Sequence, residues 1–510
     1  MPRPGPPTLA KGLMVGRGAC HISGPMCGII GLLSSTPVNQ ELYDGLALLQ
    51  HRGQDSTGMA TMDGARIHMH KGKGYVREAF RTRDMRTLKG NIGIGHVRYA
   101  TRGSASEASE AQPFYVNAPY GIVLVHNGNI VNTRELTHKL LKMDRRHLNT
   151  NSDTELLLNV LAHELQQISG VGDLTPEQIF ASVAMLHERV LGSYAVVALI
   201  AGHGLLAFRD PFGIRPLTIG KRVSEDGHVE WGVASESLLH ESGGYESVRD
   251  VAPGEAVFIT NGGEMFASQC AKNPRLVPCA FEFVYLARPD SVMSGISVYE
   301  ARLQLGNRLA DTIARYVPRG DVDVIMPIPD SSRPAAMQVA QKLGIEYREG
   351  FFKNRYVGRT FIMPGQALRQ KSVRQKLNAL GREFRGKNVL IVDDSIVRGT
   401  TSREIVEMAR SAGANKVTFC SAAPPVRFPQ VYGINMPSRR ELVAHGRHIP
   451  EIAAELGADH LIYQEVQDML AAITEGSRVS ELEMSCFTGE YVTGYVNDEY
   501  LAWVEATQQS

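Results

Sequence analysis

The sequence predicts two domains, an α+β domain followed by an α/β domain, and three observations support this. With 510 residues the chain is too long for a single hydrophobic core. From Cys27 to about Asn261, short apolar runs alternate with glycine-rich turns, which is typical of a strand-rich layered domain. After about Glu282, helix-period and strand-like segments alternate, which is the βαβ rhythm of a parallel sheet covered by helices.

The predicted boundaries follow these changes of texture. The leader, residues 1–26, is rich in Pro and Gly and shows no period. We expect a first domain at 27–261, a second at 262–467, and a C-terminal extension at 468–510 that packs on both. In the first domain we expect strands at 27–33, 92–97, 121–125, 195–200 and 205–208, and a helix at 41–50. In the second we expect helices at 298–316, 334–343 and 402–412, alternating with strands at 322–328, 389–392 and 417–422.

Composition excludes several classes of protein. The chain has 54 Lys+Arg against 53 Asp+Glu, so it lacks the basic excess of a nucleic-acid-binding surface. Its 6 cysteines are scattered without a C-x-x-C pair, which disfavours a disulfide scaffold or a zinc site. The most apolar stretch, 194–208, is interrupted by glycines and reads as two strands rather than a membrane span. The leader lacks the apolar core of a signal peptide, so we expect a cytoplasmic enzyme.

Cys27 directly follows Met26, and this arrangement is the first candidate site. Removal of the preceding residues would leave Cys27 with a free α-amine of pKa ~7.7–8.0, which can act as the base for its own thiol. Taken alone, Cys27 is better explained as a buried structural cysteine at the start of a strand, because free cysteines are usually buried. We expect the active protein to begin at Cys27. Either the leader is cleaved or translation starts at Met26, and the absence of a recognisable processing pattern favours the second.

Four further segments accompany Cys27: 51–55 (HRGQD), 95–99 (GHVRY), 126–129 (HNGN) and 151–155 (NSDTE). With these segments in this order, residues 27–256 resemble the glutamine amidotransferases that use an N-terminal nucleophile. The resemblance implies an αββα fold in which the Asn127 side-chain amide and the Gly128 N–H form an oxyanion hole. It also implies that Arg98 and Thr101 hold the carboxylate of glutamine, with Asp153 on its α-amine.

The residue types suit these roles, because neutral donors stabilise the anionic intermediate of amide cleavage and a guanidinium pairs with a planar carboxylate. Without the neighbouring segments, Asn127-Gly128 would read as a hairpin turn. The chain departs from the family pattern RYPTAG, because Ala100 and Arg102 stand in place of Pro and Ala. These two differences from the family pattern affect the geometry that we expect at Thr101, which lies between them.

The second candidate site is the string VLIVDDSIVRGTT at 389–401. A buried strand ends at Asp393 and Asp394, and a short loop then leads into a helix, with Thr401 and Glu404 at capping-box spacing. Such a loop collects backbone N–H groups and favours phosphate, and paired aspartates suit Mg²⁺ or ribose hydroxyls. An acidic helix cap would explain the glycine and threonines, but not two aspartates after a buried strand.

This string resembles the signature of type I phosphoribosyltransferases. The resemblance implies that Asp393 and Asp394 engage ribose and Mg²⁺, and that a loop cradles the 5′-phosphate; its residues are Ser395, Val397, Arg398, Gly399 and Thr400. Residues 326–332 (MPIPDSS) would form a pyrophosphate loop with Ser331 as a metal ligand. The cation-rich segment from Lys353 through Arg359 to Lys376 would form a lid over the pyrophosphate, although a solvated basic face is the usual explanation for such a run.

The two halves together resemble the amidophosphoribosyltransferase family over nearly 27–500. The resemblance implies that glutamine and phosphoribosyl pyrophosphate (PRPP) yield 5-phosphoribosylamine, glutamate and pyrophosphate, the first committed step of purine synthesis. It also implies a homotetramer inhibited by AMP- and GMP-type nucleotides. Because only Cys486 lies near the carboxyl end, we expect the branch without an iron–sulfur cluster. A sugar-phosphate aminotransferase or a PRPP-sensing regulator would each account for one half alone, and the ATP loop of asparagine synthetase is absent from the sequence.

Overall fold

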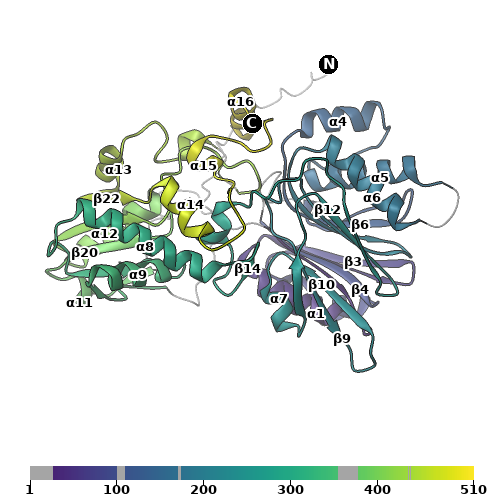
Figure 1. The fold of residues 1–510 in the computed structure, drawn as a ribbon, viewed down its shortest axis with the longest axis horizontal. Coiled ribbons are helices and arrows are strands. Elements are labelled where there is room, and N and C mark those ends of the chain that lie inside the picture. Colours follow the sequence, from purple (N-terminus) through teal and green to yellow (C-terminus); the bar gives the residue numbers. More distant parts are fainter. Residues whose placement is uncertain are drawn as a thin grey trace, which may run out of the picture.

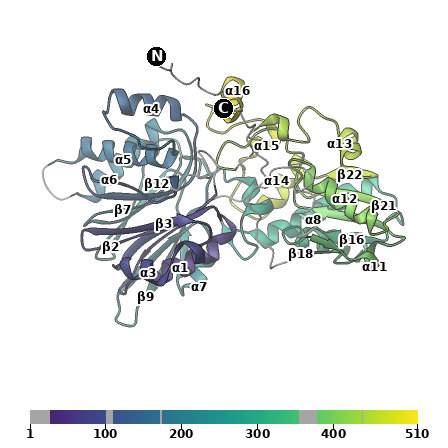
Figure 2. The same cartoon turned by 180° about the vertical axis from the view of Figure 1, so that it is seen from behind.

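The computed structural model describes residues 27–99, 110–170, 174–353, 377–434, 436 and 438–509. Two lobes lie side by side in it, and the C-terminal helix α16 (Asp498–Gln509) lies between their upper ends (Figures 1 and 2). In these described segments, no helix is both long enough and apolar enough to cross a lipid bilayer.

The first lobe is built on two antiparallel sheets. The first sheet has the strand order β11 (Glu246–Asp250), β9 (Thr218–Val223), β10 (Val229–Ala234), β1 (Gly28–Leu33), β4 (Ile92–Arg98), β2 (Ser56–Asp63) and β3 (Arg66–Lys73). The second has the order β13 (Met265–Gln269), β12 (Glu255–Thr260), β8 (Gly204–Arg209), β7 (Gly192–Ile200), β6 (Ile122–Ile130) and β5 (Phe114–Val116). The predicted strand pair within 194–208 is confirmed as the β7–β8 hairpin.

Helices cover the outer face of each sheet, which confirms the αββα arrangement (Figure 1). One core lies between the sheets and contains Ile29, Ile94 and Val125. A second core packs the first sheet against α1 (Asn39–Leu48), η1 (Leu49–His51), α2 (Val76–Ala79), α3 (Thr82–Thr87) and α7 (Leu238–Ser242). A third packs the second sheet against α4 (Thr133–Lys142), α5 (Asp153–Ile168) and α6 (Pro176–Arg189).

The connection between the lobes corrects one predicted boundary. β13 pairs with β12, so the second sheet of the first domain continues beyond Asn261, where we expected that domain to end. The chain then passes through the π-helix η3 (Glu282–Leu286) and the short strands β14 (Val292–Met293) and β15 (Ile296–Ser297) before the second lobe begins.

The second lobe contains the predicted parallel sheet. Its strand order is β17 (Glu346–Tyr347), β16 (Val324–Pro327), β20 (Asn388–Asp393), β21 (Lys416–Ser421) and β22 (His460–Tyr463), and all pairs are parallel. One face packs against α8 (Val298–Tyr316), α9 (Arg333–Leu343) and α14 (Val466–Thr474). The other face packs against α11 (Gly381–Phe384), α12 (Thr400–Ser411) and α13 (Ile449–Leu456). A separate ribbon pairs β18 (Phe351–Lys353) with β19 (Leu377–Ala379).

One detail of α12 differs from the prediction. The helix begins at Thr400 after Gly399, which has φ +73° and makes no side-chain cap, so the predicted capping box of Thr401 and Glu404 is wrong. The buried face of the helix is as expected, with Ile405 and Val406 inside the core. The N-cap residue, a glycine, therefore offers no side chain to the first N–H groups of the helix, which begins at the end of the loop after β20.

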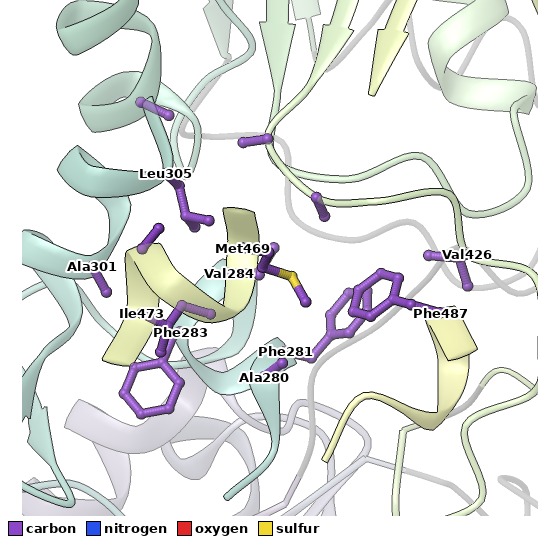
Figure 3. Close-up of a cluster of buried hydrophobic side chains, with 14 of the residues drawn as sticks. Ala280, Phe281, Phe283, Val284, Ala301, Leu305, Val426, Met469, Ile473 and Phe487 are labelled. Carbon is purple, nitrogen blue, oxygen red and sulfur yellow. The ribbon is translucent and has the colours of Figure 1, made fainter. Parts of the chain in front are cut away.

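The core around η3 brings distant parts of the sequence together (Figure 3). Phe281 and Phe487 stack with their ring centroids 5.5 Å apart and an interplanar angle of 8°. Met469 and Ile473 of α14 lie in the same cluster, and so does Val131 of the first lobe. Residues after 468, including α15 (Ser485–Thr488), thus pack into this core, which also extends across the junction of the lobes.

Candidate functional site

The Cys27 thiol lies immediately before β1 and is buried, with 7% of the residue exposed. Its Sγ lies 3.7 Å from the carbonyl oxygen of Tyr99. The pKa of the Cys27 thiol is raised to about 11, chiefly by burial; the Tyr99 contact and the charge of Arg98 lower it, and the Asp153 and Asp55 carboxylates raise it. The thiol is therefore protonated at neutral pH, and a base is needed to make it nucleophilic.

Asn127 and Gly128 lie on β6. Asn127 is 1% exposed, and within the described residues neither Oδ1 nor Nδ2 of its amide has a hydrogen-bond partner. Leaving a buried polar group unpaired costs about 1–3 kcal/mol, so this amide is poised to donate to a ligand. Gly128 has φ +150°, and a Cβ there would lie 2.0 Å from the Ser193 carbonyl oxygen, so only glycine fits.

Two more predicted glutamine-site residues lie close to these groups. Arg98 ends β4, which pairs with β1, and its Nη2 donates to Glu110 Oε2 at 2.9 Å. Asp153 is the first residue of α5, and its Oδ2 accepts the N–H of Ile130, at the end of β6, at 3.1 Å. Gly28 pairs with Val97, so Cys27 and Arg98 lie at the same end of the β1–β4 pair. The charge of Arg98 lowers the pKa of the Cys27 thiol, and that of Asp153 raises it. Thr101 lies outside the described residues, as do Ala100 and Arg102.

The two aspartates of the second site lie where β20 ends, at the carboxyl edge of the parallel sheet. The Asp394 N–H donates to Asp393 Oδ1 at 2.9 Å. The hydroxyl of Ser331, from the segment after β16, donates to Asp394 Oδ2, and the Ser395 hydroxyl donates to Asp394 Oδ1 at 2.7 Å. The structure thus brings Ser331 to the aspartates, as the sequence predicts.

Both aspartates are buried, with 9% of Asp393 and 8% of Asp394 exposed. Burial, and then the charge of Asp394, raises the pKa of the Asp393 carboxyl well above its ordinary value. Burial also raises the pKa of Asp394, although hydrogen bonds from Ser331 and Ser395 and the charge of Arg302 oppose this. Two adjacent buried carboxylates repel each other, so the pair favours binding of a proton or a cation.

The rest of the predicted phosphate loop joins β20 to α12. The Arg398 Nε donates to Glu441 Oε2 at 2.7 Å, and within the described residues its buried Nη1 has no hydrogen-bond partner. The Val397 carbonyl accepts the N–H of Val443 at 3.0 Å, which fixes the loop from the side. The loop ends at Gly399, and α12 begins at Thr400. The N-terminal N–H groups of a helix that follows such a loop favour phosphate.

The predicted lid is only partly described. Lys353 ends β18, and its Nζ lies 3.4 Å from Asp330 Oδ2 in the segment after β16. This places one lid cation next to the predicted pyrophosphate loop. Arg359 and the remainder of 354–376 lie outside the described residues.

A buried ionic network joins the first lobe to η3, the helix that leads to the second lobe, and the sequence analysis did not identify it. Arg52 donates to Glu236 through Nε and to Glu282 Oε2 through Nη2 at 2.8 Å. Glu282 Oε1 also accepts from Arg215 Nη1 at 3.3 Å. His51 Nε2 lies 2.7 Å from Glu236 Oε1, and Arg52 and His51 hold the pKa of Glu236 well below its ordinary value although burial alone would raise it.

Sequence reasoning also missed the partners of the predicted site residues. Glu110 pairs with Arg98, Glu441 pairs with Arg398, and Arg302 faces Asp394 while donating to the carbonyls of Phe283 and Ala287. None of these partners lies in a recognisable motif. Only the fold brings them to the sites.

The comparisons with known proteins agree with this geometry. Residues 96–237 match the model of the glutamine amidotransferase domain, and residues 296–425 match that of the phosphoribosyl transferase domain. Fold and sites together define a glutamine amidotransferase joined to a phosphoribosyltransferase in one chain.

Relatives that match nearly the whole chain show which family within this class it resembles. The chain is 56% identical to an amidophosphoribosyltransferase of Pseudomonas aeruginosa, over 94% of this chain and 95% of that protein. It is 54% identical to the Escherichia coli protein of the same name, with coverage of 94% and 95%. The solved glutamine PRPP amidotransferase of B. subtilis, complexed with ADP and GMP, superposes with a TM-score of 0.81 at 38% identity, covering 92% of this chain and 98% of that one.

The chain belongs to the amidophosphoribosyltransferase family. It is a transferase of purine biosynthesis that combines a glutamine amidotransferase domain with a phosphoribosyltransferase domain.

Proposed function

We propose that Cys27 releases ammonia from glutamine and that the second domain uses this ammonia to convert PRPP into 5-phosphoribosylamine and pyrophosphate. The observation that carries the proposal is the pairing of two distinct sites in one chain. The first domain holds a buried thiol and a buried amide that has no hydrogen-bond partner among the residues the structure describes, and in the second domain a buried aspartate pair ends a parallel strand. The buried network of Arg52, Glu236 and Glu282 ties the first domain to η3, the helix that connects it with the second domain.

In the glutaminase half-reaction, the Cys27 sulfur attacks the amide carbon of glutamine, and its proton passes to the free α-amine of Cys27. The Asn127 Nδ2 and the Gly128 N–H donate to the oxyanion. Ammonia leaves with a proton from that amine, and water hydrolyses the thioester to glutamate. Two features support the α-amine as the base: the pKa of the thiol is about 11, and no basic side chain among the described residues hydrogen-bonds to the sulfur.

The remaining first-domain residues would bind the amino-acid end of glutamine. The Arg98 guanidinium pairs with its carboxylate together with Thr101, and Asp153 accepts from its α-ammonium. Arg98 already holds the Glu110 carboxylate at 2.9 Å, which is the kind of group that we assign to it.

In the transfer half-reaction, ammonia displaces pyrophosphate from the anomeric carbon of PRPP. Asp393 and Asp394 would hold the ribose and Mg²⁺, with Ser331 beside them, and a bound Mg²⁺ would neutralise charge on the leaving pyrophosphate. The donor set fits this ion, because Mg²⁺ is commonly held by one or two carboxylates together with substrate phosphates. The loop from Ser395 to Thr400 would bind the 5′-phosphate through its N–H groups, and the cations of Lys353 and Arg359 would lie on the pyrophosphate.

Several finer points belong to the same proposal. We assign the chain to the branch without an iron–sulfur cluster, because such a cluster takes four cysteines and the sequence has no close cysteine pair. We infer a cytoplasmic homotetramer whose active form lacks the leader. The solved relative binds ADP and GMP, which supports feedback control of this chain by AMP- and GMP-type nucleotides.

The test separates the two half-reactions. Cys27→Ala should abolish glutamine-dependent synthesis while ammonia-dependent synthesis of phosphoribosylamine continues at the wild-type rate. Cys270→Ala is the matched control, because it removes another buried thiol from the same domain and should leave both activities intact. Loss of both activities in a folded Cys27→Ala protein would contradict the two-site proposal.

A further inference from the structure

A loop of the second domain, residues 430–434, lies directly on the strand that carries the predicted oxyanion hole. Asn129, the residue after Gly128, donates through Nδ2 to the Val431 carbonyl at 2.8 Å. The Ser193 hydroxyl, on the neighbouring strand β7, donates to the Tyr432 carbonyl at 2.7 Å. Val431 is 7% exposed and Tyr432 is fully buried, so these bonds are shielded from water.

Within this loop, Gly433 packs against the backbone of Gly128. A Cβ at Gly433 would lie 3.2 Å from the Cα and carbonyl carbon of Gly128, and Gly433 has φ +110°. Two backbones therefore meet without a side chain between them. Such a contact has no flexible atom to absorb a shift, so a displacement of one backbone moves the other.

The loop is itself held firmly. The Gln430 Oε1 accepts the N–H groups of Tyr432 at 2.8 Å and Ile434 at 3.2 Å, and the Gln430 Nε2 donates to Glu483 Oε2 at 2.9 Å. The Tyr432 carbonyl also accepts from Arg215 Nε at 2.8 Å. Since Arg215 contacts Glu282 as well, the loop is part of the ionic junction between the domains.

We propose that loop 430–434 is a positioning element for glutamine hydrolysis, through which the phosphoribosyltransferase domain sets the position of the Gly128 N–H. This inference rests on the proposed role of Gly128 as an oxyanion donor. An oxyanion donor acts only when its N–H lies about 2.7–3.1 Å from the developing charge, and small misplacements reduce catalysis strongly. Contacts from the phosphoribosyltransferase domain thus help to hold the oxyanion hole of the glutaminase domain in place.

The test inserts one methyl group at the contact. In the full-length enzyme, Gly433→Ala should lower kcat for glutamine hydrolysis on the order of tenfold or more while KM for glutamine stays near the wild-type value. Ammonia-dependent synthesis and alkylation of Cys27 by iodoacetamide should not change, because neither uses the oxyanion donors. Gly476→Ala is the matched control: its φ is +71° and no atom lies within 4 Å of the added Cβ.

A second variant changes the first-domain side of the contact between β6 and loop 430–434. Asn129→Ala removes the bond to the Val431 carbonyl without changing the loop, and it should lower kcat in the same direction. Wild-type hydrolysis in both Gly433→Ala and Asn129→Ala would overturn the inference, and so would an equal loss of ammonia-dependent synthesis, which would point to general unfolding.

Asn127→Ala, assayed in parallel, keeps the two proposals distinguishable. If Asn127→Ala hydrolyses glutamine normally, the oxyanion assignment itself fails. If Asn127→Ala is impaired while the Gly433 and Asn129 variants are normal, only the positioning role fails.

Discussion

Replacing Asn127 with alanine probes the oxyanion hole most sharply, because activity should fall while stability is retained. The Asn127 amide is 1% exposed and, within the described part of the chain, unpartnered, so its removal breaks no hydrogen bond of the resting protein. Removing one oxyanion donor lowers kcat by about 10²–10³-fold, or roughly 3–4 kcal/mol. Relief of an unpaired buried amide, worth about 1–3 kcal/mol, should offset the lost packing. We therefore expect severe loss of glutamine hydrolysis with no loss of stability.

Asn132 supplies the matched control. It is also buried, but its Nδ2 donates to the Arg189 carbonyl at 2.9 Å and its Oδ1 accepts the Leu191 N–H at 3.0 Å. Asn132→Ala should lower stability by about 1–3 kcal/mol and leave kcat near wild type. The assays are steady-state glutamate release and thermal unfolding, in which 1 kcal/mol shifts Tm by about 2–4 °C for a domain of this size. An Asn127→Ala protein that is active but destabilised, like the control, would show that Asn127 is a structural residue and not an oxyanion donor.

Three further predictions follow from the other sites. Asp393→Asn combined with Asp394→Asn should raise the KM for PRPP severely in the ammonia-dependent assay while basal glutamine hydrolysis changes little; an unchanged KM and kcat for PRPP would contradict the assignment. A preparation that retains the leader should lack glutaminase activity, because the nitrogen of Cys27 is then an amide and cannot act as a base. Intact-mass analysis and N-terminal sequencing should show that the active enzyme begins at Cys27. Full activity with the leader attached would exclude the α-amine as the base. Glu236→Ala should destabilise the protein by about 3–5 kcal/mol, since the buried charge of Arg52 loses one of its two carboxylates; denaturation at wild-type denaturant concentration would show that the network contributes little.

Much of the fold could be predicted from the sequence because local patterns determine it. The helix expected at 298–316 and the strand expected at 389–392 match α8 and β20 closely, since the first has a helical apolar period and the second is a short run of four apolar β-formers. The start of α12 could not be predicted correctly, because Gly399 adopts a positive φ and begins the helix without a side-chain cap. The end of the first domain was also misplaced, since β13 is recognisable only through its pairing with β12.

The predicted site residues for which the structure gives coordinates lie in two groups, one around Cys27 and one around Asp393. The sequence could not predict which distant residues hydrogen-bond to the residues of these two sites. Glu441 lies 43 residues from Arg398, and Tyr432 lies 239 residues from Ser193. Such contacts depend on how strands and domains pack, and no local pattern encodes them.

The most direct test of the account follows nitrogen from one site to the other. The enzyme is supplied with PRPP, Mg²⁺ and glutamine labelled with heavy nitrogen at its amide, and phosphoribosylamine is trapped and analysed by mass spectrometry. We predict that the product carries the heavy nitrogen and that glutamate and pyrophosphate form in equal amounts. Release of labelled ammonia with no labelled phosphoribosylamine would contradict the claim that the two domains carry out one reaction.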